Sequence, residues 1–290
     1  MPKKSERRIA ILHADDVGMC HGANRAFLDL AKIGAITCGS VMVPCPWFAE
    51  IAEHAGRDPK LDLGVHLTLT SEWPGYRWGP ISTRARASGL VDDQGCFPRN
   101  CRQLRATLVP EAVETEWRAQ IDRALAMGID VTHLDSHMGS AFLPELVEIY
   151  LRLGREYRLP VLMPKRLDEY MRVLKFDFVS AASHRRAVAE LEAEGMPLVD
   201  DFRMTPGAAS AESDAAYAKL FADLPIGTTY VALHPNRSGD IETIMPPRAH
   251  YRTDEVRILS DDGFLRGLDA MGIERAGMRA LRESYRARPR

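Results

Sequence analysis

Short runs of Val, Ile and Leu alternate along this chain with stretches whose apolar residues recur every three or four positions. This alternation is typical of parallel strands joined by helices, because parallel strands need a long crossover connection. Expected strands lie at residues 9–12, 36–43, 61–69, 129–135, 160–163 and 228–233. Expected helices lie at residues 22–33, 110–127, 144–155, 183–194 and 213–222, and in the last forty residues.

The order of these elements predicts an α/β fold, a distorted (β/α) barrel, with a doubly wound open sheet as the main alternative. The chain has 290 residues, which is enough for one large domain or two modest ones. No internal repeat or linker-like segment divides it, so we predict a single domain over residues 1–290. A barrel places function at the carboxyl ends of its strands.

Four of the expected strands end in side chains that bind metals or transfer protons. These are Asp15 and Asp16 after the first strand, His66 in the third, His133, Asp135 and His137 around the end of the fourth, and His234 after the last. Taken singly, each has a structural explanation: a turn, a helix cap, a buried histidine or a solvated face. One metal site explains all four at once.

Two imidazoles and one carboxylate bind a divalent cation and leave coordination positions for water and substrate, as in catalytic sites. The cysteines lie outside these motifs, which argues against a structural thiolate zinc site. We therefore expect one divalent ion as cofactor: Zn²⁺, or a harder ion such as Mg²⁺, Mn²⁺ or Co²⁺.

Composition excludes several classes of partner. The 38 basic and 40 acidic residues leave a net charge of −2, without the basic excess of a nucleic-acid binder. No apolar run approaches the ~18 residues of a membrane span, and no apolar segment follows the charged start. We expect a cytoplasmic protein whose five cysteines are reduced thiols.

Four motifs, in this order, make the chain resemble the YdjC family of carbohydrate deacetylases, including its chitooligosaccharide and hopanoid-associated members. They are Ala14-Asp15-Asp16-Val17-Gly18, Gly64-Val65-His66-Leu67-Thr68, Thr132-His133-Leu134-Asp135-Ser136-His137 and His234-Pro235, with a family-like ending from Tyr251 to Ser260. The resemblance covers nearly the whole chain. It implies a distorted (β/α) barrel that removes an acetyl group from an N-acetylated sugar in a metal-dependent reaction.

The resemblance also implies roles for single residues. The metal ligands would be Asp16, His66 and His137, the catalytic base Asp15, and the proton donor His234. Asp135 is the candidate to orient a histidine ligand, although a plain polar residue at the rim explains it equally well.

Two positions depart from the family pattern. His13 stands where many members have Asn, and Met138-Gly139-Ser140-Ala141 stands where many have further histidines. The proposed ligands are retained, so the departures bear on the substrate more than on the reaction.

Substrate contacts are expected in the long connection after the third strand, where Trp73, Tyr76 and Trp78 offer aromatic faces for a sugar. A lid or a contact in a homo-oligomer explains these aromatics equally well. Arg166 and Arg203 are further candidates because each follows an expected strand.

Three other functions fit parts of the pattern. A phosphoesterase on a similar barrel also uses Asp and His, but two-metal sites usually have more ligands. A metal-free glycosidase needs two carboxylates on opposite sides of a bond, which the adjacent Asp15 and Asp16 do not easily provide. A sugar- or metal-binding relative without activity is the third.

Overall fold

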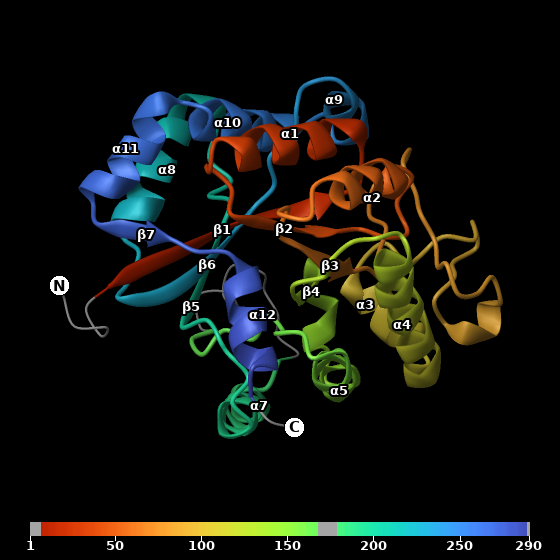
Figure 1. Cartoon of the computed structure of the whole chain (residues 1–290). Helices are drawn as coiled ribbons and strands as arrows, with labels where there is room; N and C mark the ends of the chain where they lie inside the picture. The colour runs from red at the N-terminus through yellow and green to blue at the C-terminus, as the bar shows by residue number, and fades with distance from the viewer. Residues whose placement is uncertain (1–6, 168–178, 289–290) are drawn as a thin grey trace.

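Seven parallel strands form the centre of the molecule, in a computed structural model that describes residues 7–167 and 179–288 (Figure 1). The strands are β1 (Arg8–Val17), β2 (Cys38–Val41), β3 (Leu63–Leu67), β4 (Leu134–Ser136), β5 (Asp201–Met204), β6 (Gly227–Leu233) and β7 (Ile273–Arg275). Their order is β4-β3-β2-β1-β6-β5, and β7 pairs with the first residues of β1. Because every pair is parallel, the carboxyl ends of the strands share one edge.

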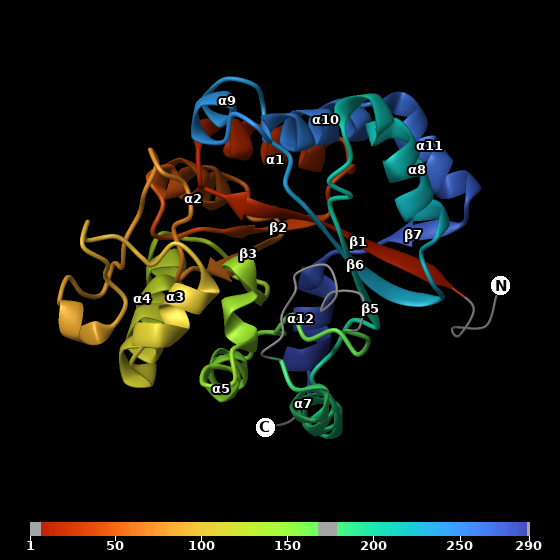
Figure 2. The same cartoon turned by 180° about the vertical axis from the view of Figure 1, so that it is seen from behind.

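Helices connect the strands and pack on both sides of the sheet. They are α1 (His21–Lys32), α2 (Phe48–Arg57), α3 (Cys101–Thr107), α4 (Pro110–Ala126), α5 (Val147–Tyr157), α7 (Ala181–Ala193), α8 (Ser213–Ala222), α9 (Asp240–Ile244), α10 (Ala249–Leu259), α11 (Asp262–Ala270) and α12 (Met278–Arg286). In both views α1, α8, α10 and α11 lie above the sheet and α4, α5 and α7 below it (Figures 1 and 2). This is the distorted (β/α) barrel that the sequence predicts.

Irregular backbone joins the two outer strands. The expected strand at 160–163 forms only one bridge, between Val161 and Leu134 of β4. Leu162 N–H donates to the carbonyl of Leu134 over 2.8 Å, and Lys165 N–H donates to the carbonyl of Val199, just before β5, over 3.0 Å. The barrel therefore closes on this side through hydrogen-bonded loops, because the pairing is too short for a ladder.

Two short strands lie where the sequence did not indicate them. β5 has four residues, and β7 has three of which one, Ile273, is buried. Such short segments carry no hydrophobic periodicity, and β7 exists because its backbone pairs with β1. The prediction that the last forty residues are helical is therefore wrong at β7.

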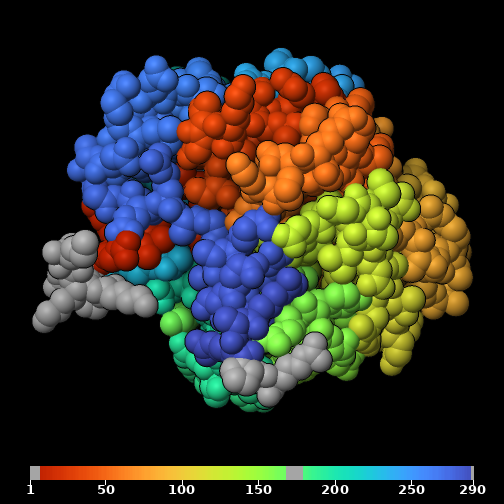
Figure 3. Space-filling model, viewed as in Figure 1, coloured from red at the N-terminus to blue at the C-terminus, as the bar shows by residue number. Residues whose placement is uncertain are grey.

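The C-terminal helix α12 lies on the surface at the amino ends of β3 and β4 and occupies the centre of the space-filling view (Figure 3). Arg282 donates to the carbonyl of Val131, just before β4, over 2.8 Å. The backbone N–H of Arg279 donates to Asp62, just before β3, over 2.7 Å. These contacts cover the amino ends of β3 and β4 and leave the carboxyl ends for the candidate site.

Two expectations from composition can be compared with the described residues. None of the helices in residues 7–167 and 179–288 is both long and apolar enough to cross a membrane. All five cysteines are free thiols. The prediction that one domain takes up all of residues 1–290 stays a prediction, because the ends and residues 168–178 lie outside the described part.

Candidate metal and acid-base site

The end of β1 turns two neighbouring carboxylates towards the same edge of the sheet. Strand geometry alone would point Asp15 and Asp16 to opposite faces. The register of β1 against β2 shifts between Ala14 and Val17, and Asp16 has a left-handed backbone with φ of 61°. Aspartate tolerates this conformation better than most residues do. The irregularity therefore brings both side chains to the rim.

Asp16 meets two histidines from other elements. Its Oδ1 atom lies 3.2 Å from Nδ1 of His137, which follows β4, and 3.5 Å from Nε2 of His66 on β3. All three side chains are buried, and one ligand atom from each lies within 4.8 Å of the others. No well-directed hydrogen bond from the described residues reaches Asp16 Oδ1. A buried carboxylate oxygen that lacks a well-directed donor and faces two imidazole nitrogens fits a bound cation.

Arg252 on α10 holds the other oxygen of Asp16. Its Nη2 atom donates to Asp16 Oδ2 over 2.7 Å, and both side chains are buried. Burial raises the pKa of Asp16, but the charge of Arg252 and the contact with His137 outweigh it, so the net pKa lies well below its usual range. Asp16 is therefore ionised and fixed in orientation, as a metal ligand must be.

His66 is oriented from behind by Asp135 of β4. His66 Nδ1 donates to Asp135 Oδ1 over 2.9 Å, and Asp135 Oδ2 accepts from Ser40 Oγ over 2.9 Å and from the Tyr230 hydroxyl over 2.8 Å. Burial lowers the pKa of His66, but the charge and hydrogen bond of Asp135, together with the charges of Asp15 and Asp16, outweigh it and the net pKa is raised. The contact sets the tautomer that leaves Nε2 facing Asp16. Asp135 thus lies where the sequence analysis expects an orienting residue.

His137 lies between two carboxylates. Its Nδ1 atom faces Asp16, and its Nε2 atom lies 3.0 Å from Glu72 Oε2, in the connection after β3. Burial lowers the pKa of His137, but Glu72 and Asp16 more than offset it and raise the pKa to about 10. Without an ion, His137 therefore carries the positive charge that these carboxylates require.

Asp15 and His234, the two residues that the sequence analysis expects to transfer protons, face each other at the edge of the site. His234 follows β6, and its Nε2 atom lies 3.7 Å from Asp15 Oδ2. Its Nδ1 atom lies 2.8 Å from Thr205 Oγ1, and Thr205 donates to Glu255 Oε1 over 2.6 Å. Thr205 therefore accepts from His234 Nδ1–H, which leaves the His234 Nε2 atom free to exchange a proton with Asp15. Burial lowers the pKa of His234, and the opposing charge of Asp15 does not restore it.

A second buried group of metal-type residues lies beside the first. It contains His13 on β1, His133 before β4, and Asp135. The Nε2 atoms of His13 and His133 are 3.0 Å apart, and His13 Nε2 lies 3.5 Å from Asp135 Oδ2. Unlike Asp16 Oδ1, the polar side-chain atoms of these three residues all have hydrogen-bond partners.

The three aromatics expected to contact substrate lie in the connection after β3, and Trp78 packs against a residue of the site. Trp78 is buried and meets the His137 ring edge to face, with centroids 6.1 Å apart. The Tyr76 hydroxyl donates to the carbonyl of Met19. Trp73 Nε1 is buried, and among the described residues it has no hydrogen-bond partner.

The two arginines proposed for substrate contact share a carboxylate instead of pointing at the metal-type residues. Arg166 Nε donates to Asp201 Oδ2 over 3.1 Å, and Arg203 Nη1 donates to Asp201 Oδ1 over 2.6 Å. Their contact with substrate stays a prediction.

Several residues of the site were not singled out from the sequence. They are Arg252, Glu72, Glu255, Ser40, Thr205 and Tyr230. Arg252 and Glu255 lie in the family-like segment that begins at Tyr251, which was the one signal available for them. The others carry no local pattern, because their roles depend on the neighbours that the fold brings to them.

Known proteins resemble this chain over much of its length. The family model of YdjC-like proteins matches residues 9–270. A carbohydrate deacetylase of Thermus thermophilus is 41% identical over 162 residues, which cover 56% of this chain and 56% of that protein. A carbohydrate deacetylase of Brevibacillus brevis is 35% identical over 154 residues, covering 53% of this chain and 58% of that protein. The matched segments thus span little more than half of these relatives.

A solved structure shares the fold over almost its full length. It is the crystal structure of a proposed cellobiose-phosphate cleavage protein from Enterococcus faecalis V583, with a TM-score of 0.76 and 24% identity. The superposition covers 95% of this chain and 99% of that one. Since the family model extends from β1 to α11 and includes every strand-end residue described above, this chain belongs to the family of YdjC-like proteins.

Proposed function

We propose that this protein is a metal-dependent hydrolase that removes the acetyl group from an N-acetylated sugar. The observation that carries the proposal is the buried Asp16 Oδ1 atom, which has no well-directed donor among the described residues and faces His66 and His137. The names of the relatives, carbohydrate deacetylases, supply the substrate class.

One divalent ion would be held by Asp16, His66 and His137. Three protein ligands leave coordination positions open, which is the pattern of catalytic rather than structural sites. A carboxylate and two imidazoles suit Zn²⁺ and also accept harder ions such as Mg²⁺. When bound, such an ion lowers the pKa of water and polarises a carbonyl.

Asp15 and His234 would transfer the protons of the reaction. Asp15 Oδ2 accepts a proton from the attacking water, while Oδ1 is held by Nδ1 of His13 over 2.7 Å. His234 Nε2 lies 3.7 Å from Asp15 Oδ2, so the proton can pass to His234 and then to the leaving amine. The lowered pKa of His234 favours a neutral resting imidazole that is ready to receive this proton.

The aromatic connection after β3 would hold the sugar. Trp73 offers a buried indole N–H that has no partner within the described structure, and a sugar hydroxyl or acetyl oxygen could accept from it. Trp78 packs on His137 and so restricts the orientation of the His137 ring.

A phosphoesterase is the second candidate, and the group of His13, His133 and Asp135 favours it because two-metal sites are common in that class. We rank it lower, since the polar atoms of this second group bond to one another and to neighbouring side chains.

Release of acetate from N-acetylated chitooligosaccharides tests the proposal. We expect activity that a chelator abolishes and a divalent ion restores. Asp15→Asn should lower kcat by about 10²- to 10⁴-fold, because it removes a general base, and it should keep the bound ion. Asp16→Asn should lose both the activity and the bound ion.

The matched pair of variants separates proton transfer from metal binding, because the two residues are adjacent and the substitutions identical. Two ions per chain together with phosphatase activity and no acetate release would contradict the deacetylase proposal, as would full activity after chelation.

A further inference from the structure

A chain of buried hydrogen bonds runs from Asp15 through the inside of the barrel to its opposite end. Asp15 Oδ1 lies 2.7 Å from His13 Nδ1, and His13 Nε2 lies 3.0 Å from His133 Nε2. His133 Nδ1 lies 2.9 Å from Thr132 Oγ1, which donates to Asp62 Oδ1 over 2.6 Å. The carboxylate at the catalytic edge is thus linked to one at the far end.

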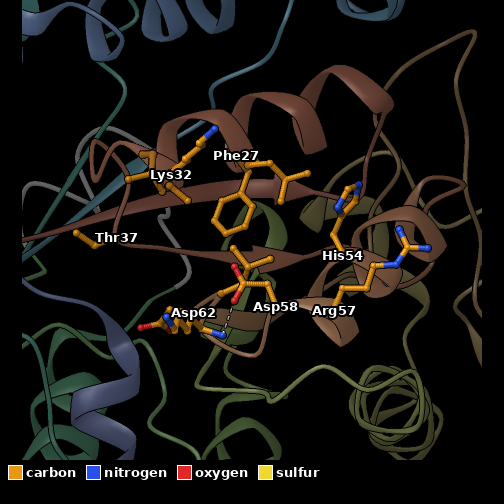
Figure 4. A pocket seen from close by; sticks show the side chains of 12 residues that line it. Phe27, Lys32, Thr37, His54, Arg57, Asp58 and Asp62 are labelled. Carbon is orange, nitrogen blue, oxygen red and sulfur yellow. Dashed lines mark hydrogen bonds between the residues drawn. The ribbon is translucent and has the colours of Figure 1, made fainter.

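Asp62 ends this chain at the wall of a cavity of about 400 Å³ between α1 and α2 (Figure 4). Its side chain is only 9% exposed, and its second oxygen accepts from the backbone N–H of Arg279 over 2.7 Å. Both oxygens of Asp62 therefore act as acceptors, although burial raises the pKa of this carboxyl above its usual value.

The donors along the chain determine where the protons lie. Thr132 has one hydroxyl proton and donates it to Asp62, so Thr132 Oγ1 must accept from His133 Nδ1–H. His13 Nδ1–H donates to the Asp15 carboxylate. If both imidazoles were neutral, two bare Nε2 lone pairs would face each other at 3.0 Å. A further proton between the two Nε2 atoms, and with it one positive charge, removes this repulsion.

We propose that this charge is a proton on His13, which makes His13 a buried imidazolium cation that holds Asp15 in place by a charge-assisted hydrogen bond. Its two N–H groups donate to Asp15 on one side and to His133 on the other.

The surroundings of His13 suit a cation. Besides Asp15, the Asp135 carboxylate lies 3.5 Å from His13 Nε2. The ring of Tyr230 on β6 stacks on the His13 ring with centroids 4.6 Å apart, and an aromatic face attracts a cation. Burial and the neighbouring His13 lower the pKa of His133 to about 3, so His133 is the neutral partner.

The role of His13 in positioning Asp15 rests on the proposed function, because that function makes Asp15 the general base. With Oδ1 bound to His13, Asp15 keeps Oδ2 towards His234, 3.7 Å away. The protein has histidine at position 13. An asparagine there would carry no charge and would not span the distance to His133. His13 is thus a positioning residue that acts through Asp15.

Nitrogen NMR of ¹⁵N-histidine-labelled protein with bound Zn²⁺ tests the protonation directly. We expect the resonances that disappear in His13→Asn to come from a ring with two N–H groups at pH 7. Those that disappear in His133→Asn should come from a neutral ring protonated at Nδ1. A neutral His13 ring would overturn the proposal.

Thr132 offers a matched pair of variants that leaves the metal-type residues untouched. Thr132→Val removes the acceptor of His133 Nδ1–H, so His133 can move its proton to Nε2 and His13 becomes neutral. Thr132→Ser keeps the hydroxyl and should keep the wild-type spectrum. If charge on His13 matters, Thr132→Val should lower kcat by about 10-fold or more, with KM and bound metal unchanged, while Thr132→Ser stays within about twofold.

Each result separates this inference from the proposed function. A wild-type protein that releases no acetate contradicts the function, while the spectrum still decides the protonation of His13. An active protein whose Thr132→Val and Thr132→Ser variants have equal kcat overturns the positioning role. Two bound ions in the wild type and one in His13→Asn would show that the second group holds a metal instead of a proton.

Discussion

At the scale of single residues, the candidate site holds opposite charges close together, and a bound ion would change their protonation. His137 lies between Glu72 and Asp16, and these carboxylates raise its pKa to about 10 despite burial. Arg252 meanwhile keeps Asp16 ionised. In the absence of an ion, the proton on His137 takes the place of the metal charge.

The affinity of the site for a divalent ion should therefore increase with pH. Below a pH of about 10, His137 carries a proton that must leave before Nδ1 can bind. For one displaced proton, the affinity should rise about tenfold per pH unit. Isothermal titration calorimetry with Zn²⁺ between pH 6 and 8 measures this.

Glu72→Gln provides the control for this prediction. It keeps a hydrogen-bonding side chain beside His137 but removes the largest charge that raises its pKa. The pH dependence should become weaker in the variant. An equally steep dependence in both proteins would mean that the proton on His137 is not the one displaced.

At the scale of elements, close approach of β3 to the segment before β4 decides where the buried histidines lie. A Cβ atom added to Gly64 on β3 would lie 2.6 Å from the His133 ring and from the His133 carbonyl oxygen. Glycine at this position thus makes room for His133 directly behind the His66 strand.

We expect Gly64→Ala to destabilise the protein by about 1–3 kcal/mol, because the overlap involves backbone as well as a buried ring. Gly56→Ala is the matched control, since an added Cβ in this helix position of α2 meets nothing within 4 Å. That substitution should be neutral or stabilise by up to about 1 kcal/mol. Urea denaturation measures both, and equal effects would show that β3 can shift freely.

At the scale of the whole molecule, the candidate ligands join segments far apart in the sequence. Asp16 ends β1, His66 lies on β3, His137 begins the 3-10 helix after β4, and Arg252 comes from α10. A bound ion would therefore stabilise the packing of the barrel as a unit.

The free energy of unfolding should therefore depend on the concentration of the free ion. At a free Zn²⁺ concentration about 100 times Kd, the free energy of unfolding should increase by about 2.7 kcal/mol, and a chelator should remove the increase. Asp16→Asn should abolish the effect. His21→Gln, which changes an exposed histidine on α1, should retain it. An equal increase in wild type and Asp16→Asn would place the ion elsewhere.

Local patterns in the sequence predict most of the longer elements and the residues at strand ends, but helices α2 and α3 were not expected. Helix α4 extends over 110–126 against an expected 110–127, because its apolar residues recur at helical spacing and Pro110 begins it. The strands β5 and β7 could not be predicted in the same way, since three or four residues carry no period.

The sequence by itself determined that Asp16, His66 and His137 follow or end parallel strands, and such ends share one edge of a sheet. Only the tertiary structure decided that Arg252 meets Asp16, that Glu72 meets His137 and that His13 meets His133. These contacts join residues from 65 to 236 positions apart, so no local periodicity encodes them. The left-handed turn at Asp16, which strand alternation would not predict, brings both carboxylates to the site.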